Sequence, residues 1–180
     1  MDDACTRETN ATPGFVLETR RLMLRRLSCR DAAFMLELLN DPAFIENVGD
    51  KGVCTEADAA RYIAQGAEAS YEHFGFGMWL VALRDGGSPV GICGLVRRDE
   101  LPHADLGFAF LQRYRSLGYA HESAAAVMRH ARSALALGRL LAVVVPGNAA
   151  SRRLLGKLGF HETRPGADDS AALMVLASDP

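Results

Sequence analysis

The run from Arg113 to Ala124 (RYRSLGYAHESA) constrains the fold most, because it joins an apolar, β-prone segment to a helical pattern. Residues 106–111 (LGFAFL) precede it, and after it apolar residues recur at helical spacing as far as Leu135. A strand that enters a helix through a glycine-containing turn leaves backbone N–H groups free at the positive end of the helix dipole. Gly118 allows a ligand to approach closely, and Arg115 adds positive charge. The run therefore predicts either an anion site, best suited to phosphate, or a plain strand-to-helix connection.

The size and composition of the chain narrow its class. With 180 residues, 49% of them hydrophobic, we expect a flexible tail over residues 1–14 and one domain over residues 15–180. A net charge of −2 without a basic, aromatic patch argues against direct nucleic-acid binding. The four cysteines lie far apart and predict reduced thiols and no metal site. No signal peptide and no run near the ~20 apolar residues of a membrane span is evident, which favours a cytoplasmic protein.

Hydrophobic periodicity predicts the order of the elements. Capping patterns at Ser28 and Thr55 begin two helices, and short connections make the strands before the Arg113–Ala124 run an antiparallel meander. The strand after the following helix should be parallel to the strand before it. The expected strands are 17–27, 78–83, 89–96, 104–111, 139–145, 160–163 and 171–177. The expected helices begin at 28, 42, 55 and 148, the one from 55 reaching about His73, and a further long helix follows the Arg113–Ala124 run to about Leu137.

Two runs of the sequence together resemble a known family. RSLGYA (residues 115–120) resembles the Q/R-x-x-G-x-G/A signature of the GNAT N-acetyltransferases, and the wider run LGFAFLQRYRSLGYAHESA resembles its form in the RimJ/RimL-like branch. VVVPGNAASRRLLGKLGF resembles the N-x-x-S…L-G-F segment of that branch. The resemblance covers about residues 15–178. It implies an α+β GNAT fold, with a mixed, mostly antiparallel seven-stranded sheet, helices on both faces, and a splay between the fourth strand, ending near Leu111, and the fifth, ending at Val145.

The resemblance also implies acetyl-CoA as the co-substrate, bound in the gap between the splayed strands. The pantetheine arm is expected to pair with backbone near Phe110 and Leu111, like an added strand, and to contact Asn148 and Ser151. Glu122 would repel a pyrophosphate and should point away from it. Ser116 and His121 stand where the family often has Gly and Thr, but neither removes a backbone donor. The residues expected around the pyrophosphate are Arg115, Ser116, Leu117, Gly118, Tyr119, Ala120 and His121.

The implied reaction transfers an acetyl group from a thioester to a primary amine by direct attack in a ternary complex. Asp105, with His103 beside it, is the candidate for the proton path, and Ser151 is the candidate for stabilising the leaving thiolate. The alternatives are that Asp105 and His103 are ordinary solvated turn residues and that Asn148 and Ser151 only begin a helix. Cys93 lies in mid-strand and is expected in the core, which argues against a covalent acetyl-cysteine.

The acceptor amine is not identified by the sequence. Loops at about 40–55, 73–77 and 164–170 should border it, and Phe74 and Phe76 belong either to its pocket or to a packed helix-to-strand junction. The candidates are a protein N-terminus and a small amine. A non-catalytic acyl-CoA sensor is the alternative function, whereas a Rossmann dehydrogenase is disfavoured because G-x-G-x-x-G is missing. An exposed last strand could pair two chains in a homodimer.

Overall fold

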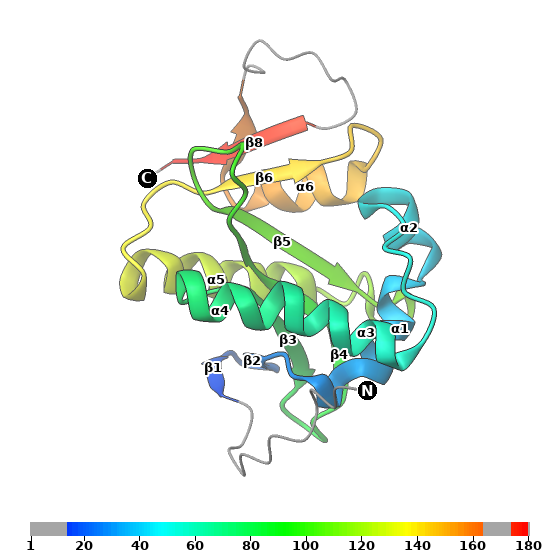
Figure 1. Ribbon diagram of the computed structural model, residues 1–180. Helices are drawn as coiled ribbons and strands as arrows, with labels where there is room; N and C mark the ends of the chain where they lie inside the picture. Colours follow the sequence, from blue (N-terminus) through cyan, green and yellow to red (C-terminus); the bar gives the residue numbers. More distant parts are fainter. Residues whose placement is uncertain (1–13, 164–173, 180) are drawn as a thin grey trace.

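A central sheet carries helices on both of its faces (Figure 1). The computed structural model describes residues 14–163 and 174–179. The tail expected over residues 1–14, except Gly14, and the acceptor loop expected at about 164–170 therefore lie outside the described residues. The division into a tail and a single domain stays a prediction.

The elements follow the predicted order closely. The strands are β1 (Phe15–Glu18), β2 (Leu22–Arg26), β3 (Met78–Leu83), β4 (Pro89–Val96), β5 (Asp105–Phe110), β6 (Leu141–Val144), β7 (Phe160–Glu162) and β8 (Met174–Ser178). The α-helices are α1 (Ala32–Leu39), α2 (Pro42–Val48), α3 (Glu56–Ile63), α4 (Ala69–Phe74), α5 (Tyr119–Ala134) and α6 (Ala149–Lys157). Shorter helical turns are Cys29–Asp31, the π-helical Ala64–Glu68 that joins α3 to α4, and Gln112–Tyr114.

The sheet is mixed and mostly antiparallel, as predicted. Among the described residues its strand order is β1-β2-β3-β4-β5-β6-β8-β7, and only β5 and β6 run parallel. These two strands share a single paired position, Asp105 with Leu141, supported by the bond from Leu141 N to Ala104 O at 2.9 Å. Beyond that point β6 has no paired position with β5, whereas on its other side it pairs with β8 along its whole length. The predicted splay is therefore present, closed at the start of β5 and open at its end.

The prediction of one first strand over residues 17–27 is wrong. The chain turns back at Thr19–Arg21, so that β1 and β2 form an antiparallel pair and the sheet has eight described strands rather than seven. Thr19 N donates to Leu22 O at 2.8 Å, and Leu22 N donates to the Thr19 hydroxyl at 3.0 Å. A threonine side chain closes this turn without glycine or proline, so the usual sequence markers of a turn are missing.

The last strand is not exposed at an edge, contrary to expectation. β8 lies between β6 and β7 and pairs antiparallel with both. Its backbone groups are therefore used on both sides, and pairing of two chains through this strand is not available. The edge strands of the described sheet are β1 and β7.

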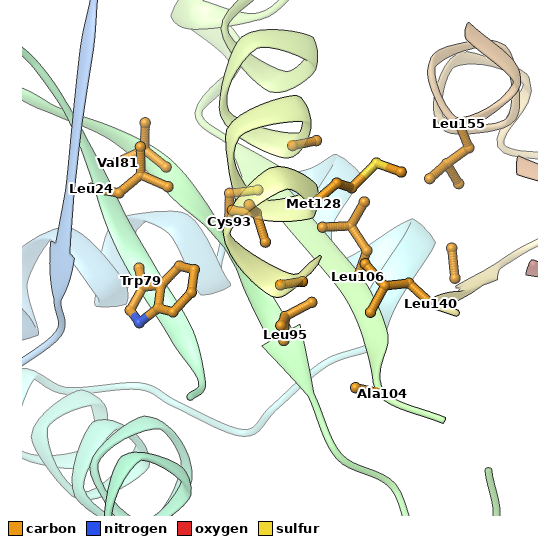
Figure 2. Close-up of a cluster of buried hydrophobic side chains, with 14 of the residues drawn as sticks. Leu24, Trp79, Val81, Cys93, Leu95, Ala104, Leu106, Met128, Leu140 and Leu155 are labelled. Atoms are coloured by element: carbon orange, nitrogen blue, oxygen red, sulfur yellow. The ribbon is translucent and has the colours of Figure 1, made fainter. Parts of the chain in front are cut away.

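Alternation along the strands builds a separate core on each face of the sheet. On one face Trp79, Val81 and Cys93 pack with Val127 and Met128 of α5, and Leu155 of α6 joins the same cluster (Figure 2). On the other face Leu80 and Ile92 pack against residues of α1, α2 and α3. Adjacent strand residues point to opposite faces, which explains how one short strand serves both cores.

Local sequence signals fix the helices on the second face. Thr55 and Asp58 form the predicted reciprocal capping box at the start of α3. The predicted helix to about His73 is continuous through the π-helical turn and ends where Gly75 adopts a left-handed φ of 77°. These helices place Phe74 and Phe76 next to the start of β5, where they line a cavity with His103 and Ala104.

Candidate acetyl-CoA site

The loop between β5 and α5 presents a run of unused backbone donors. Ser116 and Gly118 both adopt left-handed backbone, with φ of 62° and 83°. Among the described residues, the N–H groups of residues 116–121 have no protein acceptor, and the first bond of the helix runs from Glu122 N to Gly118 O at 3.0 Å. Free donors at the start of a helix, here one of 16 residues, are the arrangement that binds anions in many proteins. Ser116 therefore accepts the conformation in which the family often places glycine.

Arg115 makes its contacts within the protein. Its Nε donates to Phe110 O at 2.8 Å, and its Nη2 pairs with Asp41 Oδ1 at 2.6 Å. Asp41 also caps α2 by accepting from Ala43 N. Its burial opposes ionisation, but the bonds from Arg115 and the backbone together lower the pKa of Asp41. The arginine predicted to attract phosphate thus also ties the loop to α2.

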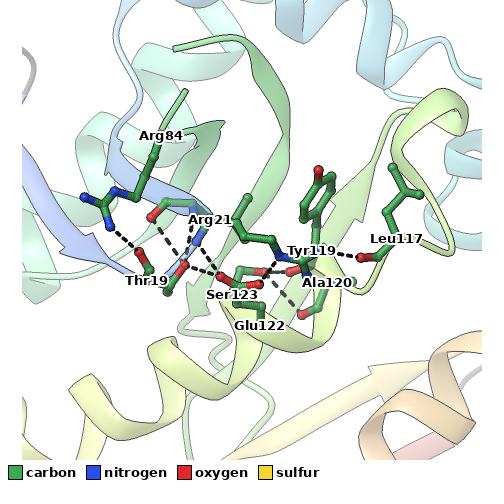
Figure 3. Close-up of polar contacts among 9 residues, drawn as sticks. Thr19, Arg21, Arg84, Leu117, Tyr119, Ala120, Glu122 and Ser123 are labelled. Carbon is green, nitrogen blue, oxygen red and sulfur yellow. Dashed lines mark hydrogen bonds and ion pairs between the residues drawn. The ribbon is translucent and has the colours of Figure 1, made fainter. Parts of the chain in front are cut away.

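Glu122 points away from the free donors, as expected. It turns toward Thr19 and Arg21 in the β1–β2 turn, and Arg21 in turn reaches Leu117 O at 2.9 Å (Figure 3). Partial burial by itself would raise the pKa of Glu122, but the hydrogen bonds from Thr19 and Arg21 lower it. Sequence reasoning missed Arg21 and Asp41, because partners separated by 74 to 101 residues leave no local signal.

Two helices begin at the same end of the gap between β5 and β6. Both strands run in the same direction, so α5 and α6, which follow them, begin at the open end of the gap. Asn148 caps α6, its Oδ1 accepting from Ser151 N at 3.0 Å, and Ser151 is half-buried in the first turn. The capping interpretation of Asn148 is confirmed, and it is compatible with a further contact to a ligand in the gap.

Phe110 and Leu111 also lie at the open end. Both are buried, and Leu111 N is already bonded to Val90 O of β4 at 3.1 Å. The Phe110 carbonyl accepts from Arg115, which uses one of its two lone pairs.

Asp105 occupies the closed end of the gap. It is 2% exposed, and its Oδ1 accepts from Arg98 Nε at 2.9 Å. Burial raises the pKa of Asp105, although the Arg98 guanidinium opposes the shift. The solvated alternative for Asp105 is therefore wrong. At about 3.3 Å per strand residue, Asp105 and Phe110 lie about 16 Å apart, at opposite ends of β5.

A cavity of about 400 Å³ adjoins the closed end of the gap. His103 and Ala104 line it beside Phe74 and Phe76, whose rings stack with centroids 5.9 Å apart. Arg97, Pro102 and residues 136–139 complete its wall. The two phenylalanines thus lie both at a helix-to-strand junction and on a cavity next to the candidate proton acceptor.

Cys93 is buried beneath α5, as predicted. It is 0% exposed, and burial raises the pKa of its thiol to about 12 against a weaker opposing contact from Ser123. A thiol in this state is a poor nucleophile. The residues that the structure describes contain no cluster of metal-ligating side chains and no helix long and apolar enough to span a membrane.

Comparison with known proteins identifies the family. The family model of the acetyltransferase (GNAT) domain matches residues 21–161. The uncharacterized N-acetyltransferase YoaA of Bacillus subtilis is 29% identical over 148 residues, covering 82% of this chain and 83% of YoaA.

Solved structures share the fold at lower identity. An acetyltransferase from Agrobacterium tumefaciens superposes with a TM-score of 0.80 at 23% identity, covering 96% of this chain and 98% of that one. RimL, the ribosomal L7/L12 alpha-N-protein acetyltransferase, in complex with coenzyme A, gives a TM-score of 0.78 at 12% identity, covering 92% and 97%. Together with the splayed sheet and the β5–α5 loop, the match over residues 21–161 shows that this chain belongs to the GNAT family of acetyltransferases, enzymes that depend on acetyl-CoA.

Proposed function

We propose that this protein transfers the acetyl group of acetyl-CoA to a primary amine, with the pyrophosphate held by the β5–α5 loop. The observation that carries the proposal is the run of unused N–H groups over residues 116–121 at the mouth of the gap. Each such group donates to a phosphate oxygen without giving up a bond within the protein. RimL, which shares the fold, is in complex with coenzyme A, which supports this class of ligand.

The pantetheine arm is proposed to follow β5 from the loop toward the closed end. Phe110 and Leu111 border its entrance, and Asn148 and Ser151 face it from the start of α6. The Ser151 hydroxyl is proposed to donate a hydrogen bond to the sulfur, which stabilises the thiolate that leaves when the C–S bond breaks. The amine nitrogen forms the new C–N bond directly, because Cys93 is buried in the core.

Asp105 is proposed to take the proton that the amine loses, through a water in the cavity beside His103. Its raised pKa brings the carboxyl closer to the working pH, which strengthens it as a base. The acceptor is proposed to enter by this cavity, past Phe74 and Phe76. An N-terminal amine, with a pKa of about 7.7–8.0, needs less help from a base than a lysine-like amine of about 10.4.

A screen of acceptors tests the proposal. Thiol release from acetyl-CoA is measured with N-terminal peptides, polyamines and aminoglycosides, and acetyl-CoA binding is measured by calorimetry. Turnover with at least one amine supports the proposal. Binding without turnover on any amine favours a non-catalytic acyl-CoA sensor, and no binding refutes both.

A further inference from the structure

The turn between β1 and β2 contacts the β5–α5 loop and the first turn of α5, although about 100 residues separate them in the sequence. Glu122 accepts three hydrogen bonds from this turn: from the Thr19 hydroxyl at 2.6 Å, Arg21 N at 2.9 Å and Arg21 Nε at 2.7 Å. The carboxylate is thereby engaged on both oxygens (Figure 3). The first turn of α5 thus carries an acid whose charge is matched by an arginine about 100 residues away.

The same arginine also touches the loop backbone. Arg21 Nη1 donates to Leu117 O at 2.9 Å, and its guanidinium lies 4.6 Å from the ring centroid of Tyr119. A Cβ placed on Gly118 would lie 3.2 Å from Arg21 Nη2, so the guanidinium follows the loop through three consecutive residues. With Leu117 O held by Arg21 and Phe110 O held by Arg115, two carbonyls around the loop point at arginines while its N–H groups stay free.

We propose that Arg21 is a positioning residue for acetyl-CoA, fixing the loop for the pyrophosphate and neutralising Glu122 beside it. This inference rests on the proposed function. A carboxylate in the first turn of a helix is stabilised by the helix dipole but repels a bound phosphate. Pairing Glu122 with Arg21 reduces this repulsion when the pyrophosphate binds. The side chain of Arg21 is 42% exposed, hence loss of its packing alone should be tolerated.

Calorimetry with two probes tests this role: coenzyme A, which carries the pyrophosphate, and pantetheine, which does not. Arg21→Gln should weaken coenzyme A binding about tenfold, as for loss of a charge-assisted bond, and leave pantetheine binding unchanged. Arg61→Gln is the matched control, because Arg61 pairs with Asp58 on the exposed surface of α3. That control should bind both probes like the wild type.

The double variant Arg21→Gln/Glu122→Gln separates positioning from general support of the fold. Removing the unpaired carboxylate should restore part of the lost coenzyme A affinity. A merely structural role predicts no such recovery, and it predicts equal losses for both probes. Either of these results would overturn the proposal, as would wild-type affinity in Arg21→Gln.

A second variant covers the case in which Arg21→Gln does not fold, and the wild type shows whether the loop or only the role of Arg21 is wrong. If Arg21→Gln does not fold, Arg21→Lys keeps the charge but not the fork that reaches both Leu117 O and Glu122, and it should show a smaller loss that is still confined to coenzyme A. If the wild type itself does not prefer coenzyme A over pantetheine, the proposed pyrophosphate loop fails. If the wild type and Arg21→Gln discriminate equally, only the role of Arg21 fails.

Discussion

Replacement of Gly118 by alanine should show whether the β5–α5 loop binds the cofactor or is an ordinary turn. Gly118 has a φ of 83°, a left-handed conformation that disfavours residues with a Cβ by about 1–2 kcal/mol. Alanine also lowers the conformational entropy of the unfolded chain, which offsets about 0.4–1 kcal/mol of that destabilisation. The net loss of unfolding free energy should be about 1 kcal/mol, or about 2–4 °C in Tm for a domain of this size.

Gly86 provides the matched control for this change. It has a φ of 78° in the β3–β4 hairpin, and a Cβ there would meet nothing within 4 Å. Gly86→Ala should therefore lose the same stability and bind coenzyme A normally. At Gly118 the Cβ would displace Arg21 Nη2, 3.2 Å away, and shift the loop, so the loss of one charge-assisted bond to phosphate should weaken binding about tenfold to a hundredfold.

Thermal melts and calorimetry on both variants provide the measurement. The reasoning requires similar melting temperatures for Gly118→Ala and Gly86→Ala but very different affinities for coenzyme A. Equal, near-wild-type affinities would refute it, because the loop would then bind coenzyme A equally well with a Cβ at position 118.

Three further changes test other parts of the site. Ser116→Gly relieves a non-glycine φ of 62° and should leave the Tm and coenzyme A affinity at least as high as in the wild type, measured by melting and calorimetry. Ser151→Ala should lower kcat about tenfold to a hundredfold with little change in coenzyme A binding, measured by thiol release. Because burial raises the pKa of Asp105 in the folded state, ionisation of this group favours the unfolded chain, and its contribution to stability falls as the pH rises above about 4. Asp105→Asn cannot ionise, so in urea unfolding its free energy of unfolding should rise relative to that of the wild type from pH 4 to 8. Its kcat should fall about a hundredfold.

The fold was predictable wherever the signal is local. The Thr55–Asp58 capping box and the strand alternation around Leu80 are carried by neighbours a few residues apart, and both are present. The β1–β2 turn was missed because Thr19 closes it with its own hydroxyl, so residues 17–27 looked like one continuous strand. The position of β8 was missed because strand order depends on pairing across the chain rather than on composition.

The site divides in the same way. The motif residues located the loop, but the partners that hold it, Arg21 and Asp41, sit elsewhere in the chain, and so does Arg98, the partner of Asp105. A charged residue acquires a partner far along the chain only through the tertiary fold, so the roles of these residues are invisible in the sequence. The burial of Asp105 is likewise set by the closed end of the gap rather than by the turn that precedes it.

These contacts explain why a six-residue motif cannot by itself define a phosphate site. A glycine turn before a helix leaves N–H groups free in many proteins. Its carbonyl groups are then free as well, and their oxygens repel an anion. Here Arg115 binds Phe110 O from one side of the loop and Arg21 binds Leu117 O from the other, while Glu122 is held by the same Arg21. The proposed selectivity of the loop for an anion therefore depends on the β1–β2 turn and on α2, and a graft of residues 113–124 without them should bind phosphate weakly.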